Sequence, residues 1–227
     1  VPAAGRATCA RPDCGATNRI VMKKLFLVDA YALIYKYYYA FLTRPMRNRT
    51  GMNTSVVFGF VKFLRDILKR ENPDLLGVAF DPKGGSFRRE LYPEYKANRP
   101  ATPEDIALSI PYIKRILDAM CVPVLEVEGF EADDVIATIA EKARAAGMKS
   151  IIATGDKDMA QLVDDDIVLI NTMNVKFYDR EGVIEKYGVP PERIVDYLSL
   201  MGDKVDNVPG IEKCGPKTAA KWIAEYG

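Results

Sequence analysis

The sequence predicts an α/β fold in which a mostly parallel central sheet has helices on both faces. Short apolar runs, each about the length of one buried strand, alternate with longer segments in which apolar residues recur at helical spacing. Several of the apolar runs end at an acidic residue. Because parallel strands end at the same edge of a sheet, and ligands bind at that edge, these acids predict a functional site there.

The expected elements follow one another along the chain. Strands are expected at 25–28, 75–80, 122–127, 150–153 and 167–170. Helices are expected at 56–68, 103–120, 132–147 and 192–201, with another that begins near 216. The acids that follow the strands are Asp29, Asp81, Glu131, Asp156 and Asp158.

Composition excludes several classes of protein. The chain has 227 residues, enough for a substantial core in one domain with a small appendage. No apolar run approaches the roughly 20 residues of a membrane span. The net charge of +1 means that any nucleic-acid binding requires charge separation on the surface. The sequence contains no histidine, which excludes Ser-His and Cys-His catalysis and histidine metal sites.

The cysteines predict no disulfide framework. They are Cys9, Cys14, Cys121 and Cys214. Their small number and scattered positions favour a reducing, cytoplasmic location. Cys9 and Cys14 would form half of a zinc site, but the second pair is missing. Residues 1–21 lack periodicity, so we expect a disordered leader or an expression remnant, with Met22 as the natural start.

The stretch from Glu131 to Asp134 begins the helix expected at 132–147. Acids in a first turn complement the positive end of the helix dipole, so this stretch alone fits a structural role equally well. The acids at the other strand ends favour a functional role. Clustered carboxylates recruit cations, and an all-oxygen site selects hard ions such as Mg²⁺ or Mn²⁺. Two such ions can activate a water and stabilise the leaving oxygen of a phosphodiester.

Segment 82–102 has no apolar pattern and combines basic with aromatic side chains. A solvated loop is the simple interpretation. A long basic and aromatic excursion from a strand end also suits the clamping of a single nucleic-acid strand, as do the tyrosines between 31 and 41. Because nothing apolar docks this segment, we expect it to be mobile without DNA and to become ordered on binding.

The last third of the chain predicts two helices joined by a glycine-rich turn. Such a turn exposes backbone N–H groups to a phosphate, and Lys213 and Lys217 add positive charge. Asp203 and Asp206 lie in the same turn and can complete the acidic cluster.

From Met22 to Gly227 the chain resembles the 5′ nuclease domain at the N-terminus of bacterial DNA polymerase I, a member of the flap endonuclease family. The motifs that carry the resemblance are Leu27-Val28-Asp29, Phe80-Asp81, Ser86-Phe87-Arg88, Tyr95-Lys96, Glu131-Ala132-Asp133-Asp134, Thr154-Gly155-Asp156-Lys157-Asp158 and the run from Gly202 to Gly210. The resemblance implies a PIN-like 5′ nuclease fold with a C-terminal helix-two-turn-helix element. It divides the chain into a nuclease core, 22–190, and a DNA-binding element, 191–227.

The resemblance also assigns roles to residues. One metal would be held by Asp29, Asp81, Glu131, Asp133 and Asp134, and a second by Asp156, Asp158, Asp203 and Asp206. Lys96 and Arg88 would be catalytic. Segment 82–102 would be the arch through which a 5′ single strand passes. Residues expected to bind DNA are Lys36, Tyr38, Lys83, Arg89, Tyr95, Arg99, Gly210, Lys213, Gly215 and Lys217, with K⁺ at the helix-two-turn-helix and Tyr38 stacking on the terminal base pair.

Two features depart from the family pattern. Lys36 stands where an arginine is usual. Lysine keeps the positive charge but loses the bidentate guanidinium fork that binds phosphate. Tyr39 stands where a histidine is frequent. The chain also ends soon after Trp222, so we expect an incomplete duplex-binding element and, normally, fusion to a polymerase domain.

The predicted function is a monomeric, structure-specific 5′ nuclease that uses two or more Mg²⁺ or Mn²⁺ ions. It would remove DNA flaps and RNA primers and act at nicks in replication and repair, in the nucleoid. Two alternatives stay open: an RNA-directed nuclease of related fold, and a DNA-junction binding module without catalysis. The arch and the element around Asp203 to Lys217 favour junction DNA as the substrate.

Overall fold

The computed structural model describes residues 22–227 and contains a six-stranded sheet with strand order β3-β2-β1-β4-β5-β6. The strands are β1 (Lys24–Asp29), β2 (Leu75–Ala79), β3 (Val124–Leu125), β4 (Lys149–Thr154), β5 (Ile167–Asn171) and β6 (Phe177–Tyr178). All neighbours are parallel except β5 and β6, which are antiparallel at one edge. The expected mostly parallel sheet is confirmed.

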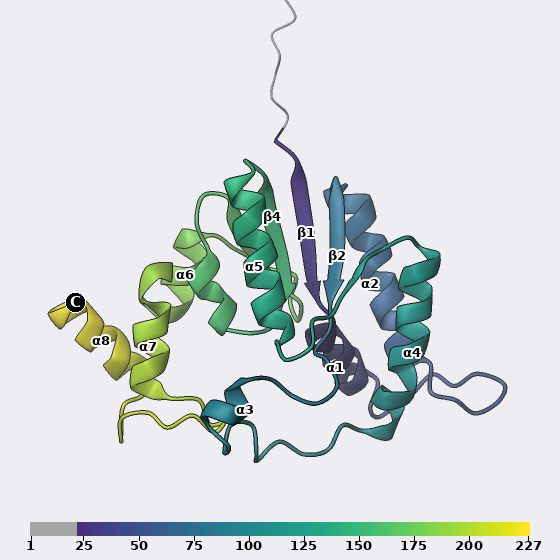
Figure 1. The fold of residues 1–227 in the computed structure, drawn as a ribbon, viewed down its shortest axis with the longest axis horizontal. Coiled ribbons are helices and arrows are strands. Elements are labelled where there is room, and N and C mark those ends of the chain that lie inside the picture. The colour runs from purple at the N-terminus through teal and green to yellow at the C-terminus, as the bar shows by residue number, and fades with distance from the viewer. Residues whose placement is uncertain (1–21) are drawn as a thin grey trace, which may run out of the picture.

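Helices cover both faces of this sheet (Figure 1). They are α1 (Ala30–Ala40), α2 (Ser55–Glu71), α3 (Arg88–Leu91), α4 (Glu104–Ala119), α5 (Ala132–Ala145), α6 (Arg180–Tyr187), α7 (Ile194–Met201) and α8 (Pro216–Tyr226), with two short 3₁₀ helices, η1 (Asp158–Leu162) and η2 (Pro191–Arg193). Helices α1, α2 and α4 pack on one face, and α5 to α8 pack on the other.

Strand β1 is buried on both sides because its apolar residues alternate between two cores. Leu25 and Leu27 belong to the core beneath α5, whereas Phe26 and Val28 belong to the core beneath α1 and α2. This placement explains the continuous apolar run, which is typical of a central parallel strand. Strand β2 pairs with one side of β1 and β4 pairs with the other, so the chain reverses its direction of travel across the sheet at β1. A parallel sheet binds its ligands at such a reversal, outside the carboxyl ends of the strands.

The carboxyl ends of the strands lead directly into helix N-termini. Asp29 is the last residue of β1 and the N-cap of α1, where its Oδ1 accepts a hydrogen bond of 3.0 Å from the Ala32 N–H. Glu131 and Asp134 form a capping box at the start of α5. The acids therefore stabilise helix starts in this structure, as the simple interpretation of the sequence predicted for Glu131 to Asp134.

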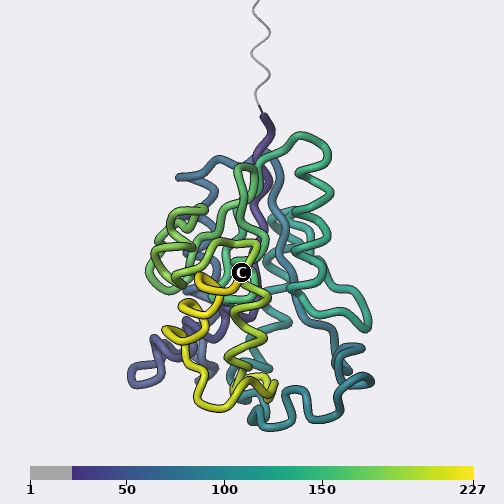
Figure 2. The backbone as a smooth tube through the Cα atoms, turned by 90° about the vertical axis from the view of Figure 1, so that its left-hand side faces the viewer, coloured from purple at the N-terminus to yellow at the C-terminus, as the bar shows by residue number. Residues whose placement is uncertain are grey.

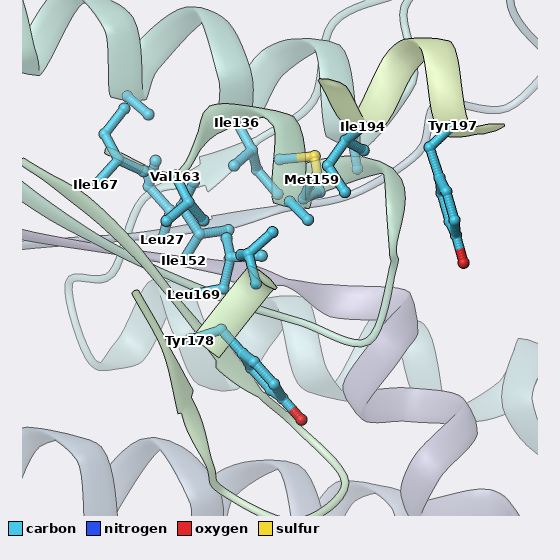
Figure 3. Packing of buried hydrophobic residues seen from close by; sticks show 14 of the residues in the cluster. Leu27, Ile136, Ile152, Met159, Val163, Ile167, Leu169, Tyr178, Ile194 and Tyr197 are labelled. Carbon is cyan, nitrogen blue, oxygen red and sulfur yellow. The ribbon is translucent and has the colours of Figure 1, made fainter. Parts of the chain in front are cut away.

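The C-terminal helices share the core of the sheet instead of forming a separate one. Figure 3 shows Ile194 and Tyr197 of α7 in the same cluster as Ile136 and Leu27. Between α7 and α8 the chain makes a close approach to itself: a Cβ at Gly210 would lie 2.3 Å from the Gly202 amide nitrogen. A side chain at either position would collide with backbone, so these glycines are required by packing.

Several features were not predicted or lie elsewhere. Strand β6 and helix α6 were missed, because their patterns are too short to give a clear period. The third strand is shorter than the expected 122–127, and segment 82–102 contains the short helix α3. The predictions for residues 1–21, including Cys9 and Cys14, lie outside the described residues. None of the helices in 22–227 combines the length and apolar character that a membrane span needs.

Candidate metal and nucleic-acid site

A cavity of about 900 Å³ opens at the carboxyl ends of the central strands. Segment 82–102 crosses this end of the molecule, with α3 beside the loop that joins α7 to α8 (Figure 1). The cavity is lined by acids from the strand ends, aromatic rings from α1 and basic side chains from segment 82–102. The lining acids are Asp29, Asp81, Glu131, Asp156, Asp203 and Asp206. Acids from five separate parts of the sequence therefore meet here.

Asp29 and Asp81 are held in place by hydrogen bonds from neighbouring elements. Asp29 is buried, and its Oδ2 accepts a hydrogen bond of 2.9 Å from the hydroxyl of Thr154, at the end of β4. Asp81 follows β2 by two residues, and its Oδ1 accepts a bond of 2.7 Å from the Ala132 N–H in the first turn of α5. The two side chains therefore tie three strand ends to α1 and α5.

Among the expected metal ligands, Asp133 has the pKa that is raised furthest. Burial raises its pKa well above the ordinary value, and the nearby carboxylates of Asp29, Asp156 and Asp81 raise it further. Burial likewise raises the pKa of Asp29, with smaller contributions from Asp81 and Asp156. These four acids therefore lie close enough to repel one another, although Asp133 itself does not line the cavity.

Asp156 and Asp158 follow β4 and lie on two sides of the same short turn. The Oδ1 of Asp156 accepts a hydrogen bond of 2.9 Å from the Asp158 N–H, which orients Asp156 toward the cavity. Asp158 lines a neighbouring groove of about 580 Å³ instead. Its Oδ1 is buried without a hydrogen-bond partner, and burial together with the charge of Asp156 raises its pKa to about 6.

Basic side chains neutralise the acids on the opposite side of the cavity. Lys96 Nζ lies 2.9 Å from Glu131 and 3.7 Å from Asp206, and Arg99 also pairs with Asp206. Lys157 pairs with Asp203 at 3.0 Å. Although burial alone would raise the pKa of Glu131, its hydrogen bond from Lys96 holds that pKa below the ordinary value. The Lys157 pair has the same effect on the pKa of Asp203.

Arg88 and Asp134 form a bidentate pair. Both guanidinium nitrogens lie 2.7 Å from the two carboxylate oxygens of Asp134, and this bonding holds the pKa of Asp134 below its usual value. Asp134 also accepts a bond of 3.0 Å from the Glu131 N–H. Neither Arg88 nor Asp134 lines the cavity. This pair therefore attaches α3 to the start of α5.

The donor set fits hard divalent cations. In residues 22–227, no three acidic or cysteine side chains converge tightly enough to surround one ion as they stand. Mutual repulsion among the acids and their pairing with Lys96, Arg99 and Lys157 account for this spacing. The chemistry of the site nevertheless suits such ions, because its ligands are all oxygens and the buried Asp158 Oδ1 has no other partner.

The expected DNA-binding residues of α1 divide into two groups. Lys36 lines the cavity, and its ammonium donates a hydrogen bond to the Thr172 carbonyl. Tyr38 does not line it and packs instead against the core beneath α1. The rings that line the cavity are those of Tyr31, Tyr35 and Tyr39. The stacking of Tyr38 on a terminal base pair stays a prediction, and the adjacent ring of Tyr39 lines the cavity.

The remaining expected DNA contacts lie on segment 82–102 and near α8. Arg89 and Arg99 line the cavity, and the hydroxyl of Tyr95 donates to Glu131 at 3.1 Å. Lys83 is exposed and does not line the cavity. Beyond the loop that lies beside α3, Lys213 and Lys217 are exposed around the N-terminus of α8, where Gly215 is the N-cap. Gly210 lies against Gly202, as described above.

Segment 82–102 is attached to the protein by polar contacts. It has no apolar stripe, as predicted, but Lys96 is only 16% exposed and is not a solvated lysine. The Lys96 N–H also donates to the Asp206 carbonyl at 2.9 Å. Backbone and side-chain hydrogen bonds therefore attach the segment where an apolar stripe is missing, and its mobility without DNA stays a prediction.

Sequence reasoning missed several residues that shape the site. The hydroxyl of Ser86 donates to Glu131 at 2.9 Å, and Thr154 bonds Asp29 as noted above. Thr172 and Met173 line the cavity next to Lys36. Thr154 and Thr172 each lie at or just beyond the end of a strand, and this position was the signal that could have identified them.

Comparison with known proteins identifies the family. The family profile described as 5′-3′ exonuclease, N-terminal resolvase-like domain, matches residues 24–188. The chain belongs to the 5′-3′ exonuclease family. A second profile of this family, the C-terminal SAM fold, matches residues 189–227. The resemblance seen in the sequence motifs is confirmed.

Individual relatives agree with this assignment. The 5′-3′ exonuclease of Aquifex aeolicus is 43% identical over 206 residues, which are 91% of this chain and 71% of that protein. DNA polymerase I of Pseudomonas aeruginosa is 47% identical over 203 residues, which are 89% of this chain but 22% of the polymerase. The chain therefore spans most of the exonuclease and a small part of the polymerase.

A solved structure shows the same fold. The bacteriophage T5 flap endonuclease, in a pseudo-enzyme-product complex with DNA and metal ions, aligns with a TM-score of 0.73 and 24% identity. The alignment covers 90% of this chain and 76% of the T5 chain. The PIN-like architecture of the family is thus present here.

Proposed function

We propose that this chain is a structure-specific 5′ nuclease that hydrolyses phosphodiester bonds of DNA flaps, nicks and RNA primers in replication and repair. The observation that carries the proposal is the composition of one cavity. Carboxylates from the strand ends, basic residues of segment 82–102 and tyrosines of α1 line it together. Acids serve the chemistry, cations attract the phosphate backbone, and aromatic rings stack on unpaired bases.

Two or more Mg²⁺ or Mn²⁺ ions are the proposed cofactors. Asp29, Asp81, Glu131 and Asp133 would hold one ion, and Asp156, Asp158, Asp203 and Asp206 would hold the second. Asp134 acts in this scheme by positioning Arg88 and the start of α5. When bound, the ions would supply an activated water and stabilise the charge of the leaving oxygen.

The chain's own residues would bind and orient the DNA. Lys96, which lies in the cavity next to Glu131, would hold a phosphate and is the proposed catalytic lysine. Arg89, Arg99 and Lys36, which line the cavity, would hold the neighbouring backbone, and the exposed Lys83 would bind DNA outside it. Arg88 would contribute through its pair with Asp134. Segment 82–102 would act as the arch over the single strand.

The C-terminal helices would hold the duplex. Residues 191–227 form the proposed helix-two-turn-helix element, where backbone N–H groups at the start of α8 and the exposed Lys213 and Lys217 face the phosphates. The proposal also includes K⁺ at this turn and a monomeric state. It further includes fusion to a polymerase domain and a location at the nucleoid. The relatives named DNA polymerase I support the fusion.

The test is metal-dependent cleavage by a variant with one neutralised acid. Asp156→Asn keeps the side-chain shape, and we expect it to lower Mg²⁺-dependent cleavage of a 5′-flap duplex by about 100-fold or more, as for the loss of one charge-stabilising group in an active site. Flap binding in EDTA should stay equal or become tighter, because one repulsive charge is removed.

The control for this test is Asp66→Asn. Asp66 lies on the outer surface of α2, in an exposed pair with Lys62, and should not affect cleavage. Flap binding without any Mg²⁺-dependent cleavage by the parent chain would favour a non-catalytic junction-binding module. Faster cleavage of single-stranded RNA than of flap DNA would favour the RNA-directed nuclease.

A further inference from the structure

Two asparagines join segment 82–102 to the loop that precedes α8. The Asn98 amide donates a hydrogen bond of 2.8 Å to the Lys204 carbonyl, and the Asn207 amide donates one of 2.9 Å to the Glu94 carbonyl. Between them, the Lys96 N–H donates to the Asp206 carbonyl at 2.9 Å. Figure 2 shows these two stretches close together at the end of the molecule where the strands terminate.

The pattern of these bonds is reciprocal. Each asparagine extends from its own segment and donates to a backbone carbonyl of the other, so the two segments are tied on both sides of the Lys96–Asp206 bond. Asn207 has φ +60°, in the left-handed region that asparagine tolerates better than most residues. We name Asn98, Asn207 and the Lys96–Asp206 backbone bond the clasp.

The clasp joins the residues proposed to carry the chemistry. On one side it holds Lys96 and Arg99, which line the cavity; on the other it holds Asp203 and Asp206. Three of these side chains also interact through charge, since Lys96 and Arg99 pair with Asp206. Such pairs change whenever a carboxylate takes another cation as its partner. The clasp uses only neutral donors and acceptors, so it does not depend on that exchange.

The residues that the clasp joins line two neighbouring hollows. Lys96 and Arg99 face the 900 Å³ cavity, whereas Tyr95 faces the groove of about 580 Å³ on the other side. Asp203 and Asp206 line both. A displacement of the clasp would therefore move basic and acidic side chains of the cavity at the same time.

We propose that Asn98 and Asn207 are positioning residues of the nuclease: they hold Lys96 of segment 82–102 at a fixed place relative to Asp203 and Asp206. This inference rests on the function proposed above. It assigns a role to two residues that do not touch the reacting atoms, and it predicts that segment 82–102 is restrained at its base before any DNA binds.

The first test measures attachment of the segment without metal or DNA. Asn98→Ala removes one donor, and Asn207→Gly removes the other while keeping a residue that accepts positive φ. In EDTA, trypsin cleavage within 82–102, followed by mass spectrometry, should be about two- to tenfold faster in each variant, the range expected for the loss of one hydrogen bond. The melting temperature of each variant should stay close to that of the parent chain.

Two controls accompany this measurement. Asn174→Ala removes an exposed asparagine that accepts only a bond of 3.1 Å within its own turn, and should leave cleavage within 82–102 unchanged. Asn98→Gln keeps an amide donor and should restore part of the protection. In the double variant the effects should be less than additive, because both asparagines close the same contact.

The second test measures flap cleavage with Mg²⁺. Both single variants should lower kcat by about two- to tenfold and leave KM within about twofold, since the side chains that contact DNA are retained. Unchanged trypsin cleavage of segment 82–102 would overturn the clasp. Faster trypsin cleavage with a parental kcat would overturn its positioning role. Absence of Mg²⁺-dependent cleavage by the parent chain would overturn the proposed function and the positioning role with it.

Discussion

Neighbouring acids of this site have opposite electrostatic environments. Glu131 and Asp134 have lowered pKa values, because Lys96 and Arg88 donate hydrogen bonds to them. Asp133 lies between these two residues in the sequence but has a raised pKa, because it is buried among other carboxylates. Consecutive residues of a helix point in different directions. The basic side chains that pair with Glu131 and Asp134 therefore do not offset the repulsion that Asp133 meets from other carboxylates. Each acid therefore contributes differently to stability.

The buried carboxylate of Asp158 gives a prediction about the stability of the protein. Its Oδ1 is buried without a partner, and a buried charge without compensation destabilises the folded state. In EDTA, Asp158→Asn should raise the free energy of unfolding by about 1 kcal/mol or more, which corresponds to about 2–4 °C or more in Tm for a chain of this size. Addition of Mg²⁺ should raise the Tm of the parent chain more than that of the variant.

The control for this prediction is again Asp66→Asn, whose exposed position predicts a change within about 0.5 kcal/mol. Thermal melts followed by circular dichroism provide both values. A lower Tm for Asp158→Asn in EDTA would show that its carboxylate is stabilised by a contact, contrary to this argument.

Helix α1 connects the aromatic residues of the sequence to the cavity. Tyr31, Tyr35 and Tyr39 recur every four residues and therefore lie along one face, with ring centroids 6.4 Å and 6.2 Å apart. Tyr38 faces about 100° away from Tyr39 by helical geometry, and its ring packs against the core. Tyr31 and Tyr35 also pack against this core, but only they and Tyr39 among the tyrosines of α1 line the cavity.

The prediction for this element contrasts two tyrosines. Tyr35→Ala should weaken binding of a flap substrate by about 1–3 kcal/mol, the range for loss of one base-stacking ring, while Tyr35→Phe should bind as the parent does. Tyr38→Ala should instead lower Tm, because it leaves a gap in the core. Fluorescence anisotropy in EDTA and thermal melts measure the two effects. Parental binding by Tyr35→Ala would remove it from the DNA interface.

The whole molecule folds around a sheet that joins both proposed functional parts. The core beneath α5 contains residues of the sheet together with Ile194, Tyr197 and Ala219 of the C-terminal element. Separate profiles match residues 24–188 and 189–227, but no separate core divides the described chain at that boundary. We therefore expect one cooperative unfolding transition.

Adjacent residues of α7 test this expectation. Ile194 is 1% exposed, so Ile194→Ala should lower the stability of the entire chain by about 2–5 kcal/mol. Val195 is 52% exposed, so Val195→Ala should have almost no effect. Urea unfolding followed by both circular dichroism and tyrosine fluorescence should give a single shifted transition for Ile194→Ala. Two separate transitions would show that the C-terminal element unfolds independently.

The sequence alone determined the features that depend on near neighbours. Apolar runs and helical spacing predicted the parallel sheet, and acids at successive strand ends predicted the site, because topology brings those ends to one edge. Only the tertiary structure decided which charges pair, such as Arg88 with Asp134, and which tyrosines face the cavity. It also placed Asn98 beside Lys204 and Asn207 beside Glu94. Contacts over such separations depend on how loops close and pack, and residue periodicity does not encode them.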